Sequence, residues 1–314
     1  MFKYVVKRII MLIPIIIVVM IASFIITHIM PGDPVKMILG DFANENQIIE
    51  MKQQLGLDKN IIEQFRIWSI GVIHGDFGQS IFLHEDVTKI ILSRIEPTFL
   101  LAIFGEVIGI LIGIPLGIIS AMKHRSVLDQ SAIGISLLGV SIPSFWLSLM
   151  LMLFFGVQLK WFPVYGYEFF ADVGFSNIKY LILPSFTIGF MQSGIIARMT
   201  RSSMLEILKQ DYIRTAQLKG VSEKSVIFKH CLKNAMPPIV TIIGFSIAVL
   251  LGGTWVVETV FNIPGTGALA ISSILKRDYP VIQGCMIFTA FIYVGVNLLV
   301  DISYAFLDPK LRIK

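Results

Sequence analysis

Six apolar runs, each of about 18 residues or more with few or no charges, constrain this chain more than any other feature. A run of that length can cross the hydrocarbon core of a bilayer as a helix, which satisfies its own backbone hydrogen bonds. The composition agrees, because 55% of the 314 residues are apolar and only 15% are charged. We therefore expect an all-α polytopic membrane protein with spans at 9–30, 99–122, 131–159, 180–197, 235–257 and 281–300.

The basic residues of the loops indicate how these spans are oriented. Lysines and arginines precede the first span and follow the second, fourth and sixth, so they share one side if the spans alternate. On the other side, residues 31–96 carry ten acidic and six basic residues, a net charge of −4. Both termini should therefore face the cytoplasm, and residues 31–96 should form a small extracytoplasmic helical domain.

The first apolar run has the basic flank of a signal peptide, with Lys3, Lys7 and Arg8 before it. It reaches Pro31 without a small-residue cleavage site, so we expect a retained membrane anchor. Cys231 and Cys285 fall on opposite sides of the predicted membrane, and no disulfide is expected between them.

A polar island at residues 211–238 separates two of the most apolar runs. From Arg198 to Lys233 there are eight basic and three acidic residues, a net charge of +5. The positive-inside rule places this loop in the cytoplasm, and setting topology is the simplest role for such a loop. The +5 equals the net charge of the whole chain, so the basic balance does not require a nucleic-acid partner.

Local signals divide the island into two short helices. Gly220 can adopt the positive φ that ends a helix. Ser222 and Glu223 provide a cap and a first-turn acid for a second helix. Pro237 and Pro238 are then expected to close that second helix.

The order of residues in this loop resembles the coupling loop of ABC-importer permeases, in the form found in the peptide and nickel permease family. Arg214, Thr215 and Ala216 stand where the family's EAA-x-x-x-G motif has its first three residues, and Gly220 is its glycine. The motif's glutamate is absent. The resemblance implies that an ATPase couples to the chain through Asp211, Tyr212, Arg214, Thr215, Ala216, Lys219, Gly220, Asn234, Ala235 and Pro237.

Further motifs resemble the same family in order along the chain. Residues 31–34 (PGDP), 55–57 (LGL) and 75–80 (GDFGQS) resemble marks of the larger-loop subunit of dipeptide, oligopeptide and nickel permeases. Glu258 begins a stretch similar to VExxFxxPGxG, and residues 307–312 resemble the terminal LDPRxR with Lys in place of Arg. The resemblance covers nearly the whole chain.

Polar residues inside the spans are candidates for a translocation path. Glu106 is the one acid well inside a predicted span, where a charge facing lipid costs about 2.5 kcal/mol or more. A protonated or hydrogen-bonded packing residue is the alternative role for it. Pro143 breaks the third span, and irregular backbone at that depth is tolerated beside protein or water. The candidates are Glu106, Ser141, Ser144, Gln192 and Asp301.

No catalytic or cofactor-binding motif is present in the sequence. Gly265 and Gly267 lack the lysine of a phosphate loop, and neither HExxH nor GxSxG occurs. His74 and His84 form no metal-binding pattern. We therefore expect a transport subunit that is not an enzyme and holds no cofactor or metal of its own.

The spans predict an anchor at 1–30, an extracytoplasmic domain at 31–96 and a membrane core at 97–314, and the resemblance implies that they form the type I ABC importer permease fold. The resemblance implies a bacterial or archaeal cytoplasmic membrane, a second homologous permease chain, two ATPase subunits that bind ATP and Mg²⁺, and an extracytoplasmic substrate-binding protein. The expected cargo is a di- or oligopeptide, with nickel, a metal chelate, haem or an oligosaccharide as alternatives. A passive channel would need no docking loop, and an intramembrane hydrolase would need paired catalytic residues.

Overall fold

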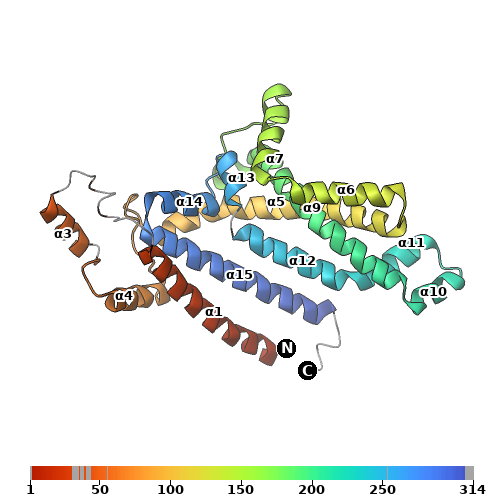
Figure 1. The fold of residues 1–314 in the computed structure, drawn as a ribbon, viewed down its shortest axis with the longest axis horizontal. Helices are drawn as coiled ribbons and strands as arrows, with labels where there is room; N and C mark the ends of the chain where they lie inside the picture. Colours follow the sequence, from red (N-terminus) through yellow and green to blue (C-terminus); the bar gives the residue numbers. More distant parts are fainter. Residues whose placement is uncertain are drawn as a thin grey trace.

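Long helices run side by side along the molecule, and shorter helices join them (Figure 1). The computed structural model describes residues 2–29, 35, 39, 44–54, 56–252 and 254–307, with side chains at all of these except 2–10, 12, 54, 171, 173 and 301–307. The long helices are α1 (Phe2–Ile29), α5 (Val87–Met122), α6 (Val127–Ser141), α9 (Ile178–Leu208), α12 (Lys233–Leu251) and α15 (Tyr279–Leu307). The shorter elements are α3 (Glu45–Gln54), α4 (Ile61–Ile73), α7 (Ser144–Leu151), η1 (Met152–Gln158), α8 (Phe170–Val173), η2 (Gly174–Asn177), α10 (Asp211–Leu218), α11 (Glu223–Ser225), η3 (Val226–Leu232), α13 (Trp255–Val260) and α14 (Thr266–Lys276).

The pair α5 and α9 forms the spine of the bundle, and glycines let the two backbones approach closely. A Cβ atom added at Gly113 would lie 2.8 Å from Cβ of Ile196, and one at Gly117 would lie 2.5 Å from Cβ of Thr200. Gly189 on α9 meets α5 in the same way. Lipid is as apolar as the helix surfaces, so close van der Waals contact of this kind is a main force between membrane helices.

The predicted spans are largely present in the described part of the chain. Four segments are long and apolar enough to cross a membrane, and a bent pair brings the number to five if it counts as one span. In α1, the stretch with described side chains from Ile13 to Ile29 is an apolar helix shorter than the length required of a span. The span expected at 9–30, which would make six, therefore remains a prediction. The four segments are Val87–Met122, Gly174–Leu208, Glu223–Leu251 and Tyr279–Val300.

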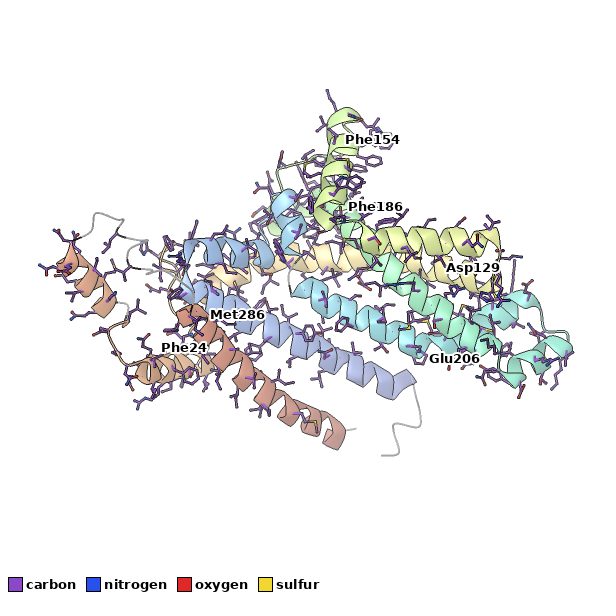
Figure 2. The ribbon with its side chains drawn as sticks, viewed as in Figure 1. Phe24, Asp129, Phe154, Phe186, Glu206 and Met286 are labelled. Atoms are coloured by element: carbon purple, nitrogen blue, oxygen red, sulfur yellow. The ribbon has the colours of Figure 1, made fainter. Side chains whose placement is uncertain are left out.

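The break predicted in the third span is confirmed, and it is a sharp turn. Ile142 takes extended backbone, with ψ of 127°, because a residue before proline is pushed out of the helical region. Pro143 itself is also extended, with ψ of 134°, and caps the start of α7. The segments on either side of the break differ in direction by 101°. The second segment, α7 with the π-helix η1, projects from the bundle, and Figure 2 places Phe154 on this arm.

The expectation that Pro237 and Pro238 end a helix is wrong. The run from Glu223 through η3 to Leu251 is helical throughout, and both prolines lie inside α12. A proline has no amide hydrogen, and its ring displaces the carbonyl four residues earlier. Ala235 and Ile239, on either side of the prolines, are buried in the packed core, and this tertiary packing keeps the run helical in spite of the lost hydrogen bonds.

The segment before α5 is fastened to the start of α15 by one buried acid. Ser80 Oγ donates a hydrogen bond to Asp278 Oδ2, and the amide of Ile81 donates to Asp278 Oδ1 at 3.2 Å. Gly75 and Gly78, from the GDFGQS motif, both have a φ of +81°, which glycine adopts without strain. This motif therefore forms a turn that positions Ser80. Residues 31–34 and 308–312 of the other motifs lie outside the described residues.

A second buried carboxylate organises the loop between α12 and α15. Glu258 on α13 is fully buried and accepts hydrogen bonds from Thr98 Oγ1 at 2.9 Å and from the amide of Ala268 at 2.8 Å. A Cβ atom at position 265 would lie 2.3 Å from the Glu258 carboxyl carbon, so Gly265 leaves the space that the carboxylate occupies. The PGxG stretch thus serves the burial of Glu258, and the pair α13–α14 is held against α5.

We expect Gly117→Ala to destabilise the protein by about 1–3 kcal/mol, because the new methyl group would overlap Thr200 across the α5–α9 contact. Gly134→Ala is the matched control, since no atom lies within 4 Å of its added Cβ and alanine favours helix. The temperature at which half of the detergent-purified protein has aggregated measures the effect. Equal midpoints for the two variants would contradict the close contact.

Candidate functional site

The predicted hinge at Gly220 is confirmed, and it joins α10 to α11 and η3 in what we call the α10–α11 hairpin (residues 211–232). Gly220 has a φ of +77°, and the amide of Val221 donates to the carbonyl of Ala216 at 3.2 Å, which closes the end of α10. Ser222 stands at the first position before α11, but its side chain makes no capping hydrogen bond. The turn therefore depends on the glycine.

Buried side chains fix the hairpin to the ends of the long helices. Ile213 of α10 and Cys231 of η3 are fully buried in one cluster with Met204 of α9 and Ile239 of α12. Residues from two short helices and two spans thus share a single apolar core. A displacement of the hairpin would therefore move α9 and α12 with it.

A hydrogen bond across the hairpin adds to this core. Asn234 Nδ2 donates to Tyr212 Oη at 3.0 Å and to the carbonyl of His230 at 2.7 Å. Two residues that the sequence singled out for coupling therefore contact each other across 22 positions. Ala235, another of them, is buried in the apolar core.

The outer surface of the hairpin carries large apolar side chains that sequence reasoning missed. Leu218 is 83% exposed and Phe228 is 58% exposed, beside the predicted residue Tyr212 at 45%. Leu218 lies five positions after the buried Ile213 and therefore on another face of α10. This spacing in the sequence could have predicted that Leu218 is exposed. The other exposed residues among those predicted for coupling are polar or glycine: they are Asp211, Arg214, Thr215, Lys219, Gly220 and Asn234.

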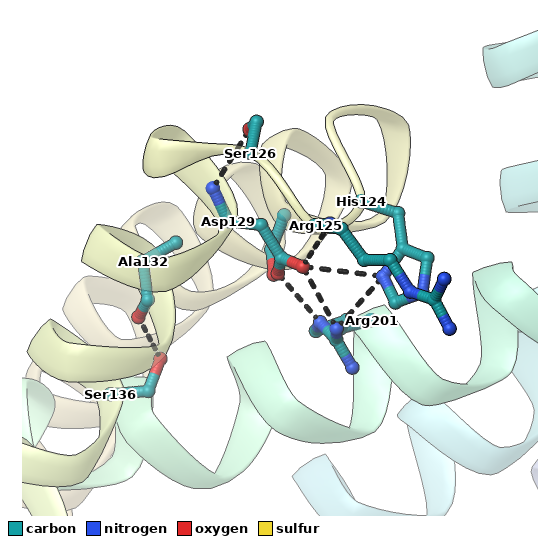
Figure 3. A network of polar contacts seen from close by, with 8 residues as sticks. His124, Arg125, Ser126, Asp129, Ala132, Ser136 and Arg201 are labelled. Carbon is teal, nitrogen blue, oxygen red and sulfur yellow. Dashed lines mark hydrogen bonds and ion pairs between the residues drawn. The ribbon is translucent and has the colours of Figure 1, made fainter.

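A buried carboxylate ties α6 to α9 close to this region (Figure 3). Asp129 accepts hydrogen bonds from Arg201 Nε at 2.9 Å and Nη2 at 3.0 Å, from the amide of Arg125 at 2.8 Å and from Ser120 Oγ. His124 Nδ1 lies 3.2 Å from the same carboxylate. Arg201 was counted among the loop's positive charges, yet its guanidinium pairs with a buried acid. A bidentate pair of this kind fixes geometry as well as charge.

Two of the five predicted path residues line one cavity of about 270 Å³, which we call the path cavity. Ser144, just after the break in the third span, and Gln192 of α9 face it together with Thr254 and Trp255. Its other lining residues are apolar: Ile188, Met191, Val249, Leu250, Val256 and Val257. The cavity therefore offers a few hydrogen-bonding groups within an apolar wall.

The other predicted path residues do not join this cavity. Ser141 is exposed at the end of α6, and the side chain of Asp301 in α15 lies outside the described residues. Glu106 is 2% exposed on α5 and faces Ser246 of α12, and neither of its carboxyl oxygens has a hydrogen-bond partner among the described residues. Glu106 faces protein, as a costly intramembrane acid should.

Family models match almost the whole chain. Residues 113–313 match the binding-protein-dependent transport system inner membrane component, and residues 1–102 match the N-terminal part of such membrane components. A chain of the inward-facing MetNI methionine ABC transporter has a TM-score of 0.58 over 70% of this chain and 96% of its own, at 16% identity. That likeness concerns the fold alone.

Relatives along the full length carry transport names. A putative peptide transport system permease protein of Brucella abortus is 41% identical over 306 residues, which cover 98% of each chain. A glutathione transport system permease protein of Salmonella choleraesuis is 40% identical over 314 residues, covering all of both chains. The chain therefore belongs to the binding-protein-dependent transport system inner membrane components, as an ABC-importer permease of the peptide and nickel family.

Proposed function

We propose that this permease imports short peptides and that the α10–α11 hairpin is the surface on which a separate ATPase subunit docks. One observation carries the proposal: the hairpin is fixed by a buried core yet exposes Leu218, Phe228 and Tyr212. Exposed apolar groups rimmed by polar residues are typical of a protein interface. The chain has no nucleotide motif of its own, so the energy for uptake comes from a partner.

The same core gives the mechanism a physical route. Nucleotide-driven closure of the ATPases would move the hairpin, and the shared cluster would pass that displacement to α9 and α12. Both helices line the path cavity, at Gln192 and Val249 respectively. Alternating access then consists of a change in the packing around this cavity.

The cavity and the relatives support peptide cargo. Ser144, Gln192 and Thr254 can bond to peptide groups, whereas no described lining residue is the histidine, cysteine or carboxylate that nickel prefers. The names of the relatives cited above mention peptide and glutathione transport. The full assembly in this proposal contains a second permease chain, two ATPase subunits and an extracytoplasmic binding protein, with both termini of this chain in the cytoplasm.

We expect Leu218→Asp to weaken binding of the ATPase subunit by about 2 kcal/mol, because a charge would replace an apolar contact at the centre of the interface. Leu275→Asp is the matched control, since Leu275 is 74% exposed on α14, far from the hairpin. Co-purification of the ATPase with each variant measures the effect, after membrane insertion has been checked. Equal ATPase recovery with both variants would remove the docking assignment.

Gly220→Val should uncouple uptake from ATP hydrolysis, because a β-branched residue at a φ of +77° costs on the order of 1–2 kcal/mol locally and redirects α10. The position is open to solvent, so strain rather than a clash causes the loss. Lys224→Ala should matter much less, since an exposed charge contributes under about 1 kcal/mol. Peptide uptake and peptide-stimulated ATP hydrolysis in the reconstituted complex test this. Normal coupled uptake in Gly220→Val is the result that would refute it.

The proposed orientation places Asp58 outside and Lys224 in the cytoplasm. In a background with Cys231→Ala and Cys285→Ala, we expect Asp58→Cys to react with a membrane-impermeant thiol reagent in intact cells. Lys224→Cys should react only after the membrane is permeabilised. Both positions are exposed, so accessibility of the side chain itself does not limit labelling. The reverse pattern would overturn the topology.

A further inference from the structure

The sharp turn in the third span leaves the start of a helix at the path cavity. Ser144, the first residue of α7, lines that cavity, and α7 leads from it into the arm that projects from the bundle (Figure 1). The first amides of a helix have no partner within the helix. Here the amides of Ser144, Phe145 and Trp146 donate to no other group of the described chain, and Pro143 before them provides no capping side chain. Three backbone donors are therefore free at this end of α7.

Gln192 of α9 presents another free donor to the same cavity. Its side chain is only 9% exposed, yet its amide group bonds to no other described residue. Unlike the oxygens of Glu106, its polar atoms keep accessible surface, and the residue lines the cavity. A Cβ atom at Gly109 of α5 would lie 3.1 Å from Gln192 Cβ, so the stem of the glutamine is held by packing. A ligand that accepts from this amide would form a hydrogen bond that the folded chain leaves unmade.

Polar contacts keep these donors in place. Ser148, one turn into α7, is fully buried, and its Oγ donates to Thr187 Oγ1 of α9 at 3.5 Å. The start of α7 is thus held beside the helix that carries Gln192. Thr254, on the opposite wall, donates from Oγ1 to Glu258 Oε1 at 3.2 Å. The carboxylate of Glu258 is fully buried and does not line the cavity, so it leaves the cavity free for another anion.

This arrangement favours a single negative charge over a positive one. The N-terminal end of a helix carries a partial positive charge, and its free amides bind carboxylate and phosphate groups. The remaining wall is mostly apolar, which strengthens hydrogen bonds to a charged acceptor relative to water. No described residue that lines the cavity is a lysine, arginine or histidine, so a doubly charged anion would lack a counter-charge. A monovalent carboxylate is the anion that neutral donors of this kind suit best.

We propose that the path cavity binds the C-terminal carboxylate of the peptide cargo, which accepts hydrogen bonds from the free amides at the start of α7 and from Gln192 Nε2. This inference rests on the proposed function and adds to it the part of the peptide that the permease recognises. Every linear peptide has one such carboxylate, whatever its sequence. A site made of backbone amides and one neutral side chain therefore accepts many sequences, while the apolar wall contacts the last side chain.

Uptake of trialanine and of its C-terminal amide by the reconstituted complex tests the proposal. The amide keeps the length of the peptide and removes the carboxylate. Each peptide is supplied at a concentration that saturates the isolated binding protein, and the same binding protein serves every variant. A change in the ratio of the two uptake rates therefore belongs to the permease. The parent complex should import trialanine about tenfold faster than its amide, as expected for the loss of a charge-assisted hydrogen bond.

Two variants remove donors from different elements. Gln192→Leu removes the side-chain amide. Ser144→Pro removes one backbone amide hydrogen at a position where a helix tolerates proline, and Pro143 already has the extended backbone required before a proline, with ψ of 134°. Each variant should slow the uptake of trialanine several-fold and bring its rate toward that of the amide. Ser144→Ala is the matched control, because it retains the backbone amide and should retain the parent ratio.

The outcomes separate this inference from peptide import as such. Equal uptake of the two peptides by the parent, or the parent ratio in both Gln192→Leu and Ser144→Pro, would overturn the inference and leave peptide import in place. A ratio lowered as much by Ser144→Ala as by Ser144→Pro would assign binding to the hydroxyl and would equally overturn it. No trialanine uptake by the parent would refute the proposed function, and the inference with it. A folding defect in one variant leaves the other as the test.

Discussion

The close approach of α5 and α9 is the contact on which the rest of the molecule depends. Membrane helices gain little from the hydrophobic effect when they meet, so they associate through close packing and polar contacts. The neighbouring core helices use surfaces that this pair creates: α6 and α12 pack on both helices, and α13–α14 is held to α5 through Glu258. The glycines of α5 that face α9 at short range are Gly105, Gly109, Gly113 and Gly117.

This packing makes α9 a stiff connection between the two candidate sites. Gln192 lines the path cavity, Arg201 holds Asp129 of α6, and Met204 lies in the core under the hairpin. Twelve positions of a helix separate the first from the last, about 18 Å at 1.5 Å per residue. A continuous helix packed along glycines transmits a displacement over that length with little loss. In the proposed mechanism, α9 therefore carries a displacement of the hairpin to the wall of the path cavity.

Local structure could be predicted from the sequence because local chemistry causes it. Gly220 ends a helix through its own backbone freedom, and Pro143 breaks a span by pushing the residue before it out of the helical region. Pairings between distant residues could not be predicted, since the periodicity of a sequence does not say which helices meet. Glu258 accepts a hydrogen bond from Thr98, 160 positions away, and Arg201 donates one to Asp129, 72 positions away. The prolines of α12 failed as a stop signal because the buried packing of Ala235 and Ile239 keeps the helix intact on both sides of them, a tertiary effect that no local rule includes.

The buried acids differ in how far hydrogen bonds offset the free-energy cost of burying their carboxyl groups. Asp129 and Glu258 each accept several hydrogen bonds, so their burial is matched by partners. Glu106 has none among the described residues, although it is just as buried. It lies where α5 faces Ser246 of α12, and α12 continues directly into η3 and the hairpin. A shift of the hairpin along this helical run would change the surroundings of Glu106 without breaking a hydrogen bond of its carboxylate, so the α5–α12 contact is the one that we expect to rearrange during transport.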